Sequence, residues 1–162
     1  MARLDEYYRD PHPPPVQGLL PVAYAVVRDG PDGRVLLVRR ADDGNWELPG
    51  GRVDVGESAA AAAVREVAEE AGIAVELTGL VGVFSDPSHI VVYVQEGARQ
   101  QLAVCFHAVP RQHDDTTARP DHDETIAATW FDPAETAALA MHPAVRERLT
   151  HALDHPGRPH FD

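Results

Sequence analysis

The sequence lacks the features that mark several large classes of protein. Its 162 residues include one cysteine, so disulfide bonds cannot support the fold. No apolar run approaches the roughly 20 residues that a membrane-spanning helix needs, and the amino end lacks the apolar core of a signal peptide. This length is typical of one domain that buries a core without disulfides or structural metals. We therefore expect a single cytoplasmic domain with no membrane partner.

Positive charge is also scarce, and lysine is missing. The chain has 26 acidic and 14 basic residues, which give a formal net charge of -12, and every basic residue is arginine. Non-specific binding to nucleic acid relies on a positive surface that displaces counterions, so we expect no nucleic-acid partner. We interpret the preference for arginine as a coding bias rather than as a sign of the reaction.

Carboxylates, in contrast, are concentrated between residues 51 and 73. Glu66, Glu69 and Glu70 are spaced i, i+3 and i+4, which places them on one face of a helix. Like charges this close destabilise a helix unless a cation neutralises them. Carboxylate oxygens select magnesium, manganese or calcium, and magnesium commonly binds phosphate as well. The pattern predicts a metal site and favours phosphate chemistry, although a plain solvated helix face is the simpler alternative.

The ends of this helix are marked in the sequence. Ser58 is a suitable N-cap, and Gly72 stands where a helix often ends in a left-handed residue, so we predict a helix that runs to Ala71. We expect its acids to face outward and its opposite face to bury against a sheet through Val64, Val67, Ala68 and Ala71. Glycines and a proline precede the helix, and a backbone carbonyl there could join the metal.

The same residues carry a family resemblance. Gly51, Glu57 and the run Arg65-Glu66-Val67-Ala68-Glu69-Glu70-Ala71-Gly72-Ile73 resemble a complete Nudix box, with no defining position changed. The preceding Trp46 to Gly50 resembles the usual lead-in to that box. Nudix proteins are mostly hydrolases that cleave a nucleoside diphosphate linked to another group with magnesium or manganese. The resemblance implies the same activity and cofactor here, with a small nucleotide as substrate.

The resemblance also implies roles for individual residues. Glu66, Glu69 and Glu70 would be metal ligands, one of them also able to deprotonate the attacking water, and the Gly50 carbonyl would be a further ligand. Arg65 would orient Glu57. Some relatives recruit a glutamate from a distant loop ahead of a Trp-containing strand. Glu124 has that position, with the nearby acids Asp121 and Asp123 as competitors.

Substrate contacts are harder to assign from the sequence. Arginine recognises phosphate through paired hydrogen bonds, and the arginines near the box are Arg28, Arg39, Arg40 and Arg52. Aromatic side chains that could stack on a base are Phe84, Tyr24, Tyr93 and Trp46, although each is more often part of a core. We read Cys105 as a core residue, and we see no histidine with an evident partner. His113 and His122 lack the tight spacing of a transition-metal site.

The remaining chain predicts an α/β (α+β) domain. We expect strands at Val22 to Arg28 and Val35 to Arg40, joined as a hairpin by the turn Gly30 to Gly33, and further β-segments at 75–84, 90–94, 101–109 and 125–131. Asp132-Pro133 and Pro143 should each begin a helix, and residues 111–124 have the composition of a surface loop. The resemblance implies an α/β/α sandwich with a mixed sheet between helices.

We divide the chain into an N-terminal arm (1–18), a Nudix domain (19–155) and a C-terminal tail (156–162). The proline-rich arm should be extended or a short helix outside the core, and it could pack on a partner in a homodimer. The predicted function is a magnesium-dependent pyrophosphohydrolase acting on a nucleotide sugar such as ADP-ribose or on a nucleoside triphosphate. The alternative is a noncatalytic nucleotide sensor.

Overall fold

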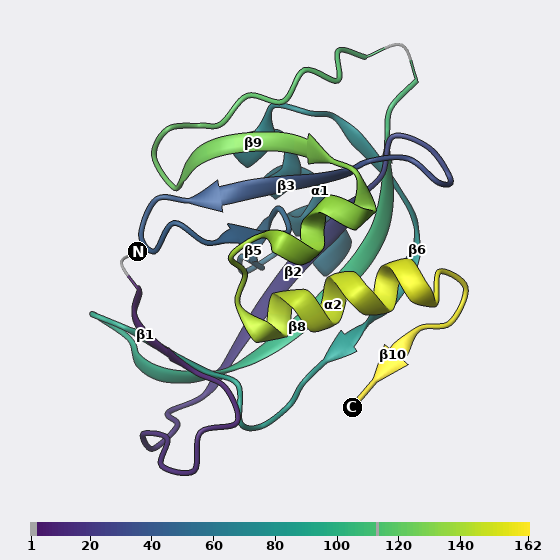
Figure 1. The fold of residues 1–162 in the computed structure, drawn as a ribbon. Helices are drawn as coiled ribbons and strands as arrows, with labels where there is room; N and C mark the ends of the chain where they lie inside the picture. The colour runs from purple at the N-terminus through teal and green to yellow at the C-terminus, as the bar shows by residue number, and fades with distance from the viewer. Residues whose placement is uncertain (1–2, 113) are drawn as a thin grey trace.

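The computed structural model describes residues 3–112 and 114–162. Two α-helices and one 3-10 helix accompany ten strands in this part of the chain (Figure 1). The strands are β1 (Arg3–Tyr7), β2 (Leu19–Val27), β3 (Val35–Arg40), β4 (Trp46–Glu47), β5 (Gly50–Arg52), β6 (Val75–Phe84), β7 (Ile90–Tyr93), β8 (Gly97–Pro110), β9 (Thr125–Phe131) and β10 (His160–Phe161). The helices are α1 (Ala59–Ala71), η1 (Pro133–Ala138) and α2 (Pro143–Asp154). The described helices are all too short and too polar to cross a membrane.

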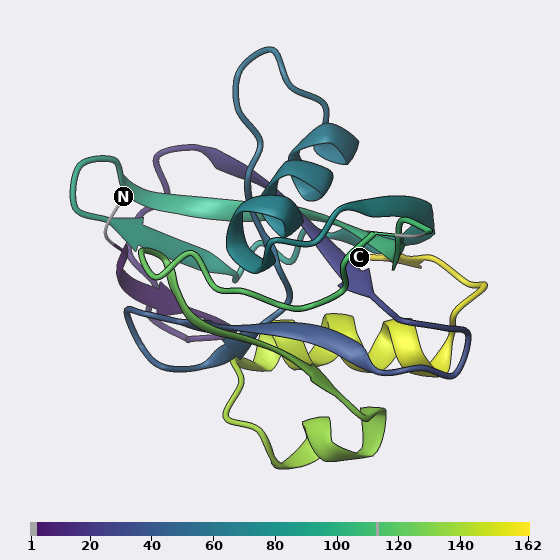
Figure 2. The ribbon, with the colours of Figure 1, turned by 90° about the horizontal axis from the view of Figure 1, so that it is seen from above.

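The strands form two sheets. The larger is mixed, with the order β1-β7-β8-β2-β5, and β6 joins it by pairing with β8 and β10. The smaller has the order β4-β3-β9. Helices α1 and α2 lie on opposite sides of the larger sheet, as the view from above shows (Figure 2). This architecture confirms the predicted mixed sheet between helices.

The predicted hairpin between β2 and β3 is wrong. Both strands have the expected bounds within a few residues, but β2 pairs with β5 and β8, whereas β3 pairs with β4 and β9. Only an isolated bridge between Arg28 and Val35 joins them. Both are apolar and almost completely buried, so each is stabilised most as the middle strand of its own sheet.

Helix α1 has the ends that the sequence predicts. The Ser58 hydroxyl accepts a hydrogen bond from the Ala61 amide at 3.1 Å. At the other end Gly72 has a φ of 68° and its amide bonds to the Ala68 carbonyl. Such a positive φ strains residues with a side chain, so glycine is the suitable residue at this end.

The predicted faces of α1 need correction. Val67 and Ala71 are buried as expected, but Ala68 is exposed, and Glu66 and Glu70 are buried. The small residues Ala62 and Ala63 let the helix lie close against Ala23 of β2. Contact at this side turns Glu66 and Glu70 inward, toward the interior between the two sheets, and leaves Glu69 on the outer surface.

The opposite side of the larger sheet is covered by α2. Val145 and Leu149 are buried against residues of β2 and β8, and Leu153 packs at the edge of this cluster. Cys105 is in the same core, as predicted. Helix α2 also buries Arg148, whose side chain is 2% exposed. A charged residue at this depth is unusual and requires partners.

Part of the N-terminal arm is extended: residues Arg3–Tyr7 form strand β1, which pairs with its own chain. Strand β1 runs antiparallel to β7 at the edge of the larger sheet, with Glu6 opposite Val91. In this position β1 covers a sheet edge that would otherwise expose unpaired backbone groups. The packing of this arm therefore does not call for a partner subunit.

The cap of α1 generates a stability prediction. Ser58→Ala removes the acceptor of the Ala61 amide and should lower the free energy of unfolding by about 1 kcal/mol. Ser58→Asp keeps an acceptor at the same place and should be close to the original protein. Urea denaturation measures both, and equal stability of the two variants would contradict the capping role.

Candidate functional site

A cavity of about 540 Å³ opens between the two sheets at the buried end of the acidic helix. The acids on its wall come from four separate segments: Asp42 from the loop after β3, Glu47 from β4, Glu66 and Glu70 from α1, and Asp123 and Glu124 from the loop before β9. Its other polar residues include Arg3, Arg40, Arg52 and Gln101. This volume is in the range of small-molecule binding sites.

Strand β5 holds the two buried glutamates against the cavity. The Gly50 amide donates a hydrogen bond to the Glu70 carboxylate at 2.9 Å. A side chain on Gly51 would begin 2.4 Å from the Glu66 carboxylate oxygen, so the glycine is what lets this strand lie so close. The close approach of this strand thus has a direct steric cause, since any larger residue at position 51 would displace Glu66.

Arg65 connects the carboxylates around the helix. Its guanidinium makes two hydrogen bonds to Glu57, at 2.9 and 3.0 Å, and single bonds to Glu66 at 2.8 Å and Glu69 at 3.0 Å. It also donates to the Arg52 carbonyl of β5 at 3.1 Å. These bonds hold α1, β5 and the loop that carries Glu57 in one arrangement.

The buried acids resist ionisation. Burial raises the pKa of Glu70 well above its usual value, and the negative charges of Glu47, Glu66 and Glu124 add to the shift despite the bond from Gly50. Burial also raises the pKa of Glu66, although Arg65 opposes the change. In contrast, the hydrogen bonds from Arg65 lower the pKa of Glu57. A cation bound at the cavity would stabilise the ionised forms of Glu70 and Glu66.

The loop before β9 brings two of its three candidate acids to the cavity. Glu124 and Asp123 line it, while Asp121 accepts hydrogen bonds from the amides of Asp123, Glu124 and Thr125 and so organises the loop. The Thr125 hydroxyl donates to the Glu70 carbonyl at 3.1 Å, which ties the loop to the end of α1.

The structure separates the other predicted substrate contacts. Arg40 and Arg52 line the cavity, and each pairs with a glutamate, at 2.6 Å to Glu47 and 2.7 Å to Glu96. Arg28 and Arg39 do not line it, since their side chains donate to the Gly33 and Gly44 carbonyls of their own turns. Phe84 is also remote from the cavity, stacked on His160 with ring centroids 4.5 Å apart. Of the other aromatic candidates, Tyr24 and Tyr93 line the cavity.

Sequence reasoning missed four polar residues of this cavity: Arg3, Asp42, Glu47 and Gln101. Arg3 comes from β1, which appeared to be outside the domain. Glu47 and Gln101 are polar residues on strands, and both are less than 10% exposed. A buried polar residue in a strand requires a partner or a ligand, and this could have marked both positions.

The donor set at the cavity fits a hard divalent cation. Glu66 and Glu70 supply carboxylate oxygens whose negative charge is only partly compensated in the buried site. The backbone of Gly50 lies beside Glu70, to which its amide donates. Carboxylate, carbonyl and water oxygens are the ligands of magnesium and manganese. Glu69 is the outer member of the predicted set, with a side chain 56% exposed and paired with Arg65.

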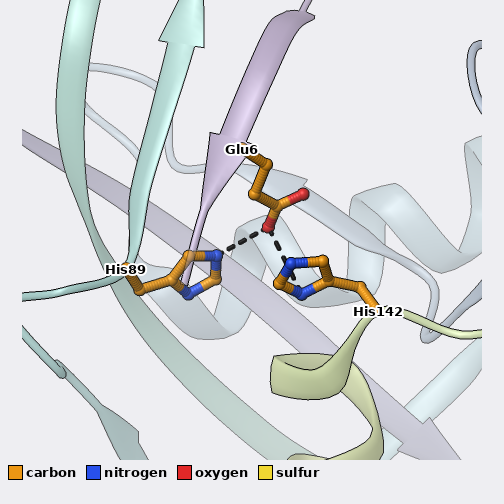
Figure 3. A group of neighbouring side chains, drawn as sticks. All are labelled: Glu6, His89 and His142. Atoms are coloured by element: carbon orange, nitrogen blue, oxygen red, sulfur yellow. Dashed lines mark hydrogen bonds and ion pairs between the residues drawn. The ribbon is translucent and has the colours of Figure 1, made fainter. Parts of the chain in front are cut away.

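A second group of potential ligands lies apart from these acids (Figure 3). Ligand atoms of Glu6, His89 and His142 are all within 4.8 Å of one another. His89 Nε2 lies 2.6 Å from Glu6, and its Nδ1 faces Arg148 Nη2 at 3.4 Å. Arginine only donates, so Nδ1 must accept and Nε2 must carry the proton. A metal on Nε2 needs the opposite tautomer.

The third member of this group is similarly engaged. His142 Nδ1 accepts a hydrogen bond from the Ala144 amide as the N-cap of α2 and lies 3.6 Å from Glu6. We therefore interpret Glu6, His89 and His142 as a polar latch, in which Glu6 of β1 bonds to His89 and His89 contacts Arg148 of α2. Of the histidines considered from the sequence, His122 is exposed and His113 lies outside the described residues.

Comparison with known proteins agrees with the geometry of the cavity. The family model of the NUDIX domain matches residues 19–153. The chain belongs to the Nudix family. It is 37% identical over 139 residues to a MutT-like protein of Streptomyces ambofaciens, which covers 86% of this chain and 79% of that protein. It is 53% identical over 132 residues to an RNA pyrophosphohydrolase of Caulobacter vibrioides, with 72% of this chain and 74% of the relative covered.

The comparison with solved structures supports the fold. A NUDIX hydrolase from Nitrosomonas europaea superposes with a TM-score of 0.70 over 94% of this chain and 81% of that one, at 23% identity. As a Nudix hydrolase the protein acts on phosphoric anhydride bonds. Nudix domains bind nucleotide substrates, and Nudix enzymes generally use divalent metals. Strand β1 and the residues after 153 lie outside the matched region.

Arg65 generates the first prediction for this site. Arg65→Met leaves Glu57, Glu66 and Glu69 facing one another without a cation, so we expect kcat to fall by roughly 10- to 100-fold. Arg65→Lys should recover little of this loss, because an ammonium cannot make the paired bonds to Glu57. The exposed pair Arg119–Asp115 offers the control Arg119→Met. Full activity of Arg65→Met would contradict the positioning role.

The latch generates a pH prediction. Burial opposes ionisation of Glu6, but the bond from His89 and the charges of His142 and Arg3 outweigh it and lower its pKa to about 2. Because the folded value lies below the unfolded one, this ionised group stabilises the fold above about pH 4.5, and that stabilisation is lost as the pH falls toward 2.

Glu6→Gln should therefore lower the free energy of unfolding at pH 7 by about 2 kcal/mol. The difference from the original protein should shrink as the pH falls from 5 toward 3. Thermal melts across this range test it, with the exposed neighbour Asp5→Asn as the control. A difference that is constant with pH would rule out the ionised latch.

Proposed function

We propose that the protein is a magnesium- or manganese-dependent Nudix pyrophosphohydrolase that cleaves a nucleoside diphosphate derivative by attack of water on phosphorus. The observation that carries this proposal is the pair of buried carboxylates, Glu66 and Glu70, on the wall of a 540 Å³ cavity. Burial raises the pKa of both acids, which supports a site that receives a cation. An intact catalytic acid set favours hydrolysis over a noncatalytic sensor.

The side chains divide into those that hold the metal and those that support them. Glu66 and Glu70, with Glu69 and the Gly50 carbonyl, would hold the cation, which when bound neutralises phosphate charge and activates water. Arg65 fixes Glu66 and Glu69 and is itself anchored on Glu57. Glu124 and Asp123 reach the same cavity from a separate loop, so either can accept the proton of the attacking water.

The cavity also supports a substrate larger than phosphate alone. Arg40 and Arg52 stand on its wall, and the Arg52 guanidinium lies 4.4 Å from the centroid of the Tyr93 ring. Arginine and aromatic faces together suit the phosphate and base of a nucleotide. The proposed substrates are a nucleotide sugar such as ADP-ribose and a nucleoside triphosphate.

Glu70→Gln tests the hydrolase directly. Glutamine resembles the protonated acid that the buried site favours, so the variant should melt within a few degrees of the original protein in chelator. Its kcat should fall by roughly 10²- to 10⁴-fold, and the rise in melting temperature that magnesium or manganese produces should disappear.

Product release from ADP-ribose, nucleotide sugars and nucleoside triphosphates, with each metal or with chelator, measures this loss. Glu76→Gln, at an exposed position of β6, is the matched control. Metal-linked stabilisation without turnover of any substrate would favour the sensor. Unchanged turnover in Glu70→Gln would refute the assignment of this acid.

A further inference from the structure

Gln101 of β8 has an unusual position in the cavity wall. It is paired with Leu20 of β2, and the next residues on the same face are Val22 and Tyr24 of β2, which also line the cavity. Gln101 is only 5% exposed. A neutral polar group in such a place is stabilised only by hydrogen bonds from the protein or from a bound molecule.

The buried Arg148 determines which end of the Gln101 amide faces the cavity. Arg148 Nη2 lies 2.6 Å from Gln101 Oε1. A guanidinium has donors and no acceptor, so the atom that faces it must be the amide oxygen. The NH2 group of Gln101 is then directed away from Arg148. The alternative amide orientation would place two donors against each other.

The NH2 group has no protein acceptor among the described residues. The hydrogen bond that the Gln101 side chain makes there is the one that its Oε1 accepts from Arg148. The NH2 group is not sealed in the core either. Across residues 3–112 and 114–162, Arg148 Nε is the one fully buried side-chain donor without a partner. Since Gln101 lines the cavity, its free donors are accessible from there.

Arg148 has little freedom to release the amide. Its guanidinium lies over the Tyr24 ring, 4.8 Å from the centroid, and 5.7 Å from that of Phe84. Another contact reaches His89 Nδ1 at 3.4 Å, and His89 is held by Glu6 of the latch. The orientation of the Gln101 amide is therefore set by a network that runs from β1 through α2 to β8.

We propose that Gln101 is a specificity-determining residue whose NH2 group donates to an oxo group on the nucleobase of the substrate. The inference rests on the proposed function, which places the phosphates at the acids of α1 and leaves the nucleoside for other parts of the wall. Among the proposed substrates it favours those with a guanine, hypoxanthine or uracil base over the adenine of ADP-ribose. A side chain that only donates favours a base edge with a carbonyl acceptor over one with an amino group, which is a second donor.

The test compares pairs of nucleotides whose bases differ in this group: inosine triphosphate with ATP, and UTP with CTP. The original protein should prefer the oxo member of at least one pair in kcat/KM. Gln101→Glu keeps the size and the bond to Arg148 but presents an acceptor. It should shift the oxo-to-amino ratio toward the amino member by about 10-fold or more.

Gln100→Glu is the matched control. It has the same chemical change one residue earlier on β8, where alternation of side chains places it on the other face of the sheet, and its amide bonds to the Ser85 carbonyl. Its ratio should equal that of the original protein. Gln101→Met removes the donor and should lower kcat/KM for the oxo substrate without a gain for the amino one.

Arg148 is a positioning residue in this scheme. Arg148→Met frees the amide to rotate, so the oxo-to-amino ratio should approach one, and Arg148→Lys, which still only donates, should recover the preference. Melting temperatures of all variants report whether the fold persists. The Gln101 variants alone decide the proposal if Arg148→Met does not fold.

The outcomes separate this inference from the proposed function. Nucleotide dissociation constants are measured beside kcat/KM, so the same ratios are available if turnover is absent. A protein that neither binds nor hydrolyses any nucleotide overturns both proposals. If the original protein turns over nucleotides but Gln101→Glu changes the oxo-to-amino ratio by less than twofold, the role of Gln101 is overturned. The proposed hydrolase function is unaffected by that result.

Discussion

Negative charge buried at the inner face of α1 is the constraint on which the site depends. Ala62 and Ala63 bring the helix so close to β2 that Glu66 and Glu70 face the interior between the sheets. Burial raises the pKa of both acids. The packing that stabilises the helix therefore also creates a demand for a cation, and the fold places this demand on the wall of a cavity large enough for a nucleotide.

Arg65 meets part of that demand and so divides the acids into two groups. Its bonds satisfy Glu57 and Glu69 and reach one oxygen of Glu66, whereas Glu70 has a single backbone donor from Gly50. Glu70 is therefore the acid whose negative charge is least compensated by the protein, and a metal bound there would interact most strongly with it. The glycines of β5 are part of the same arrangement, because a side chain on Gly51 would occupy the place of Glu66.

Local sequence signals predicted the parts of the site that are built by one segment. The ends of α1 and the spacing of its acids depend on residues close in the chain, and the structure contains both. The pairing of Arg65 with Glu57, which the Nudix resemblance implied, is also present. The depth of Glu66 and Glu70 was not predictable in the same way. It follows from which side of the helix meets the sheet, and helical spacing alone leaves that open.

Contacts between distant segments explain the remaining differences. The local sequence favoured a β2–β3 hairpin, but β2 pairs with β8 and β3 pairs with β9, both of which are distant in the chain. Arg28 and Arg39 were near the acids in sequence, yet each bonds within its own turn. Glu6 and His89 are 83 residues apart and carry no motif, so only the pairing of β1 with β7 brings them together.

The latch and the cavity are parts of one polar network. Glu6 orders His89, His89 and two aromatic rings confine Arg148, and Arg148 orients the amide of Gln101. A buried guanidinium is costly unless its donors are used, and here its use links an edge strand outside the matched Nudix region to the wall of the cavity. Covering the sheet edge would require only backbone pairing by β1. The buried charges that accompany this pairing are better explained if they also hold a group at the cavity in a fixed orientation.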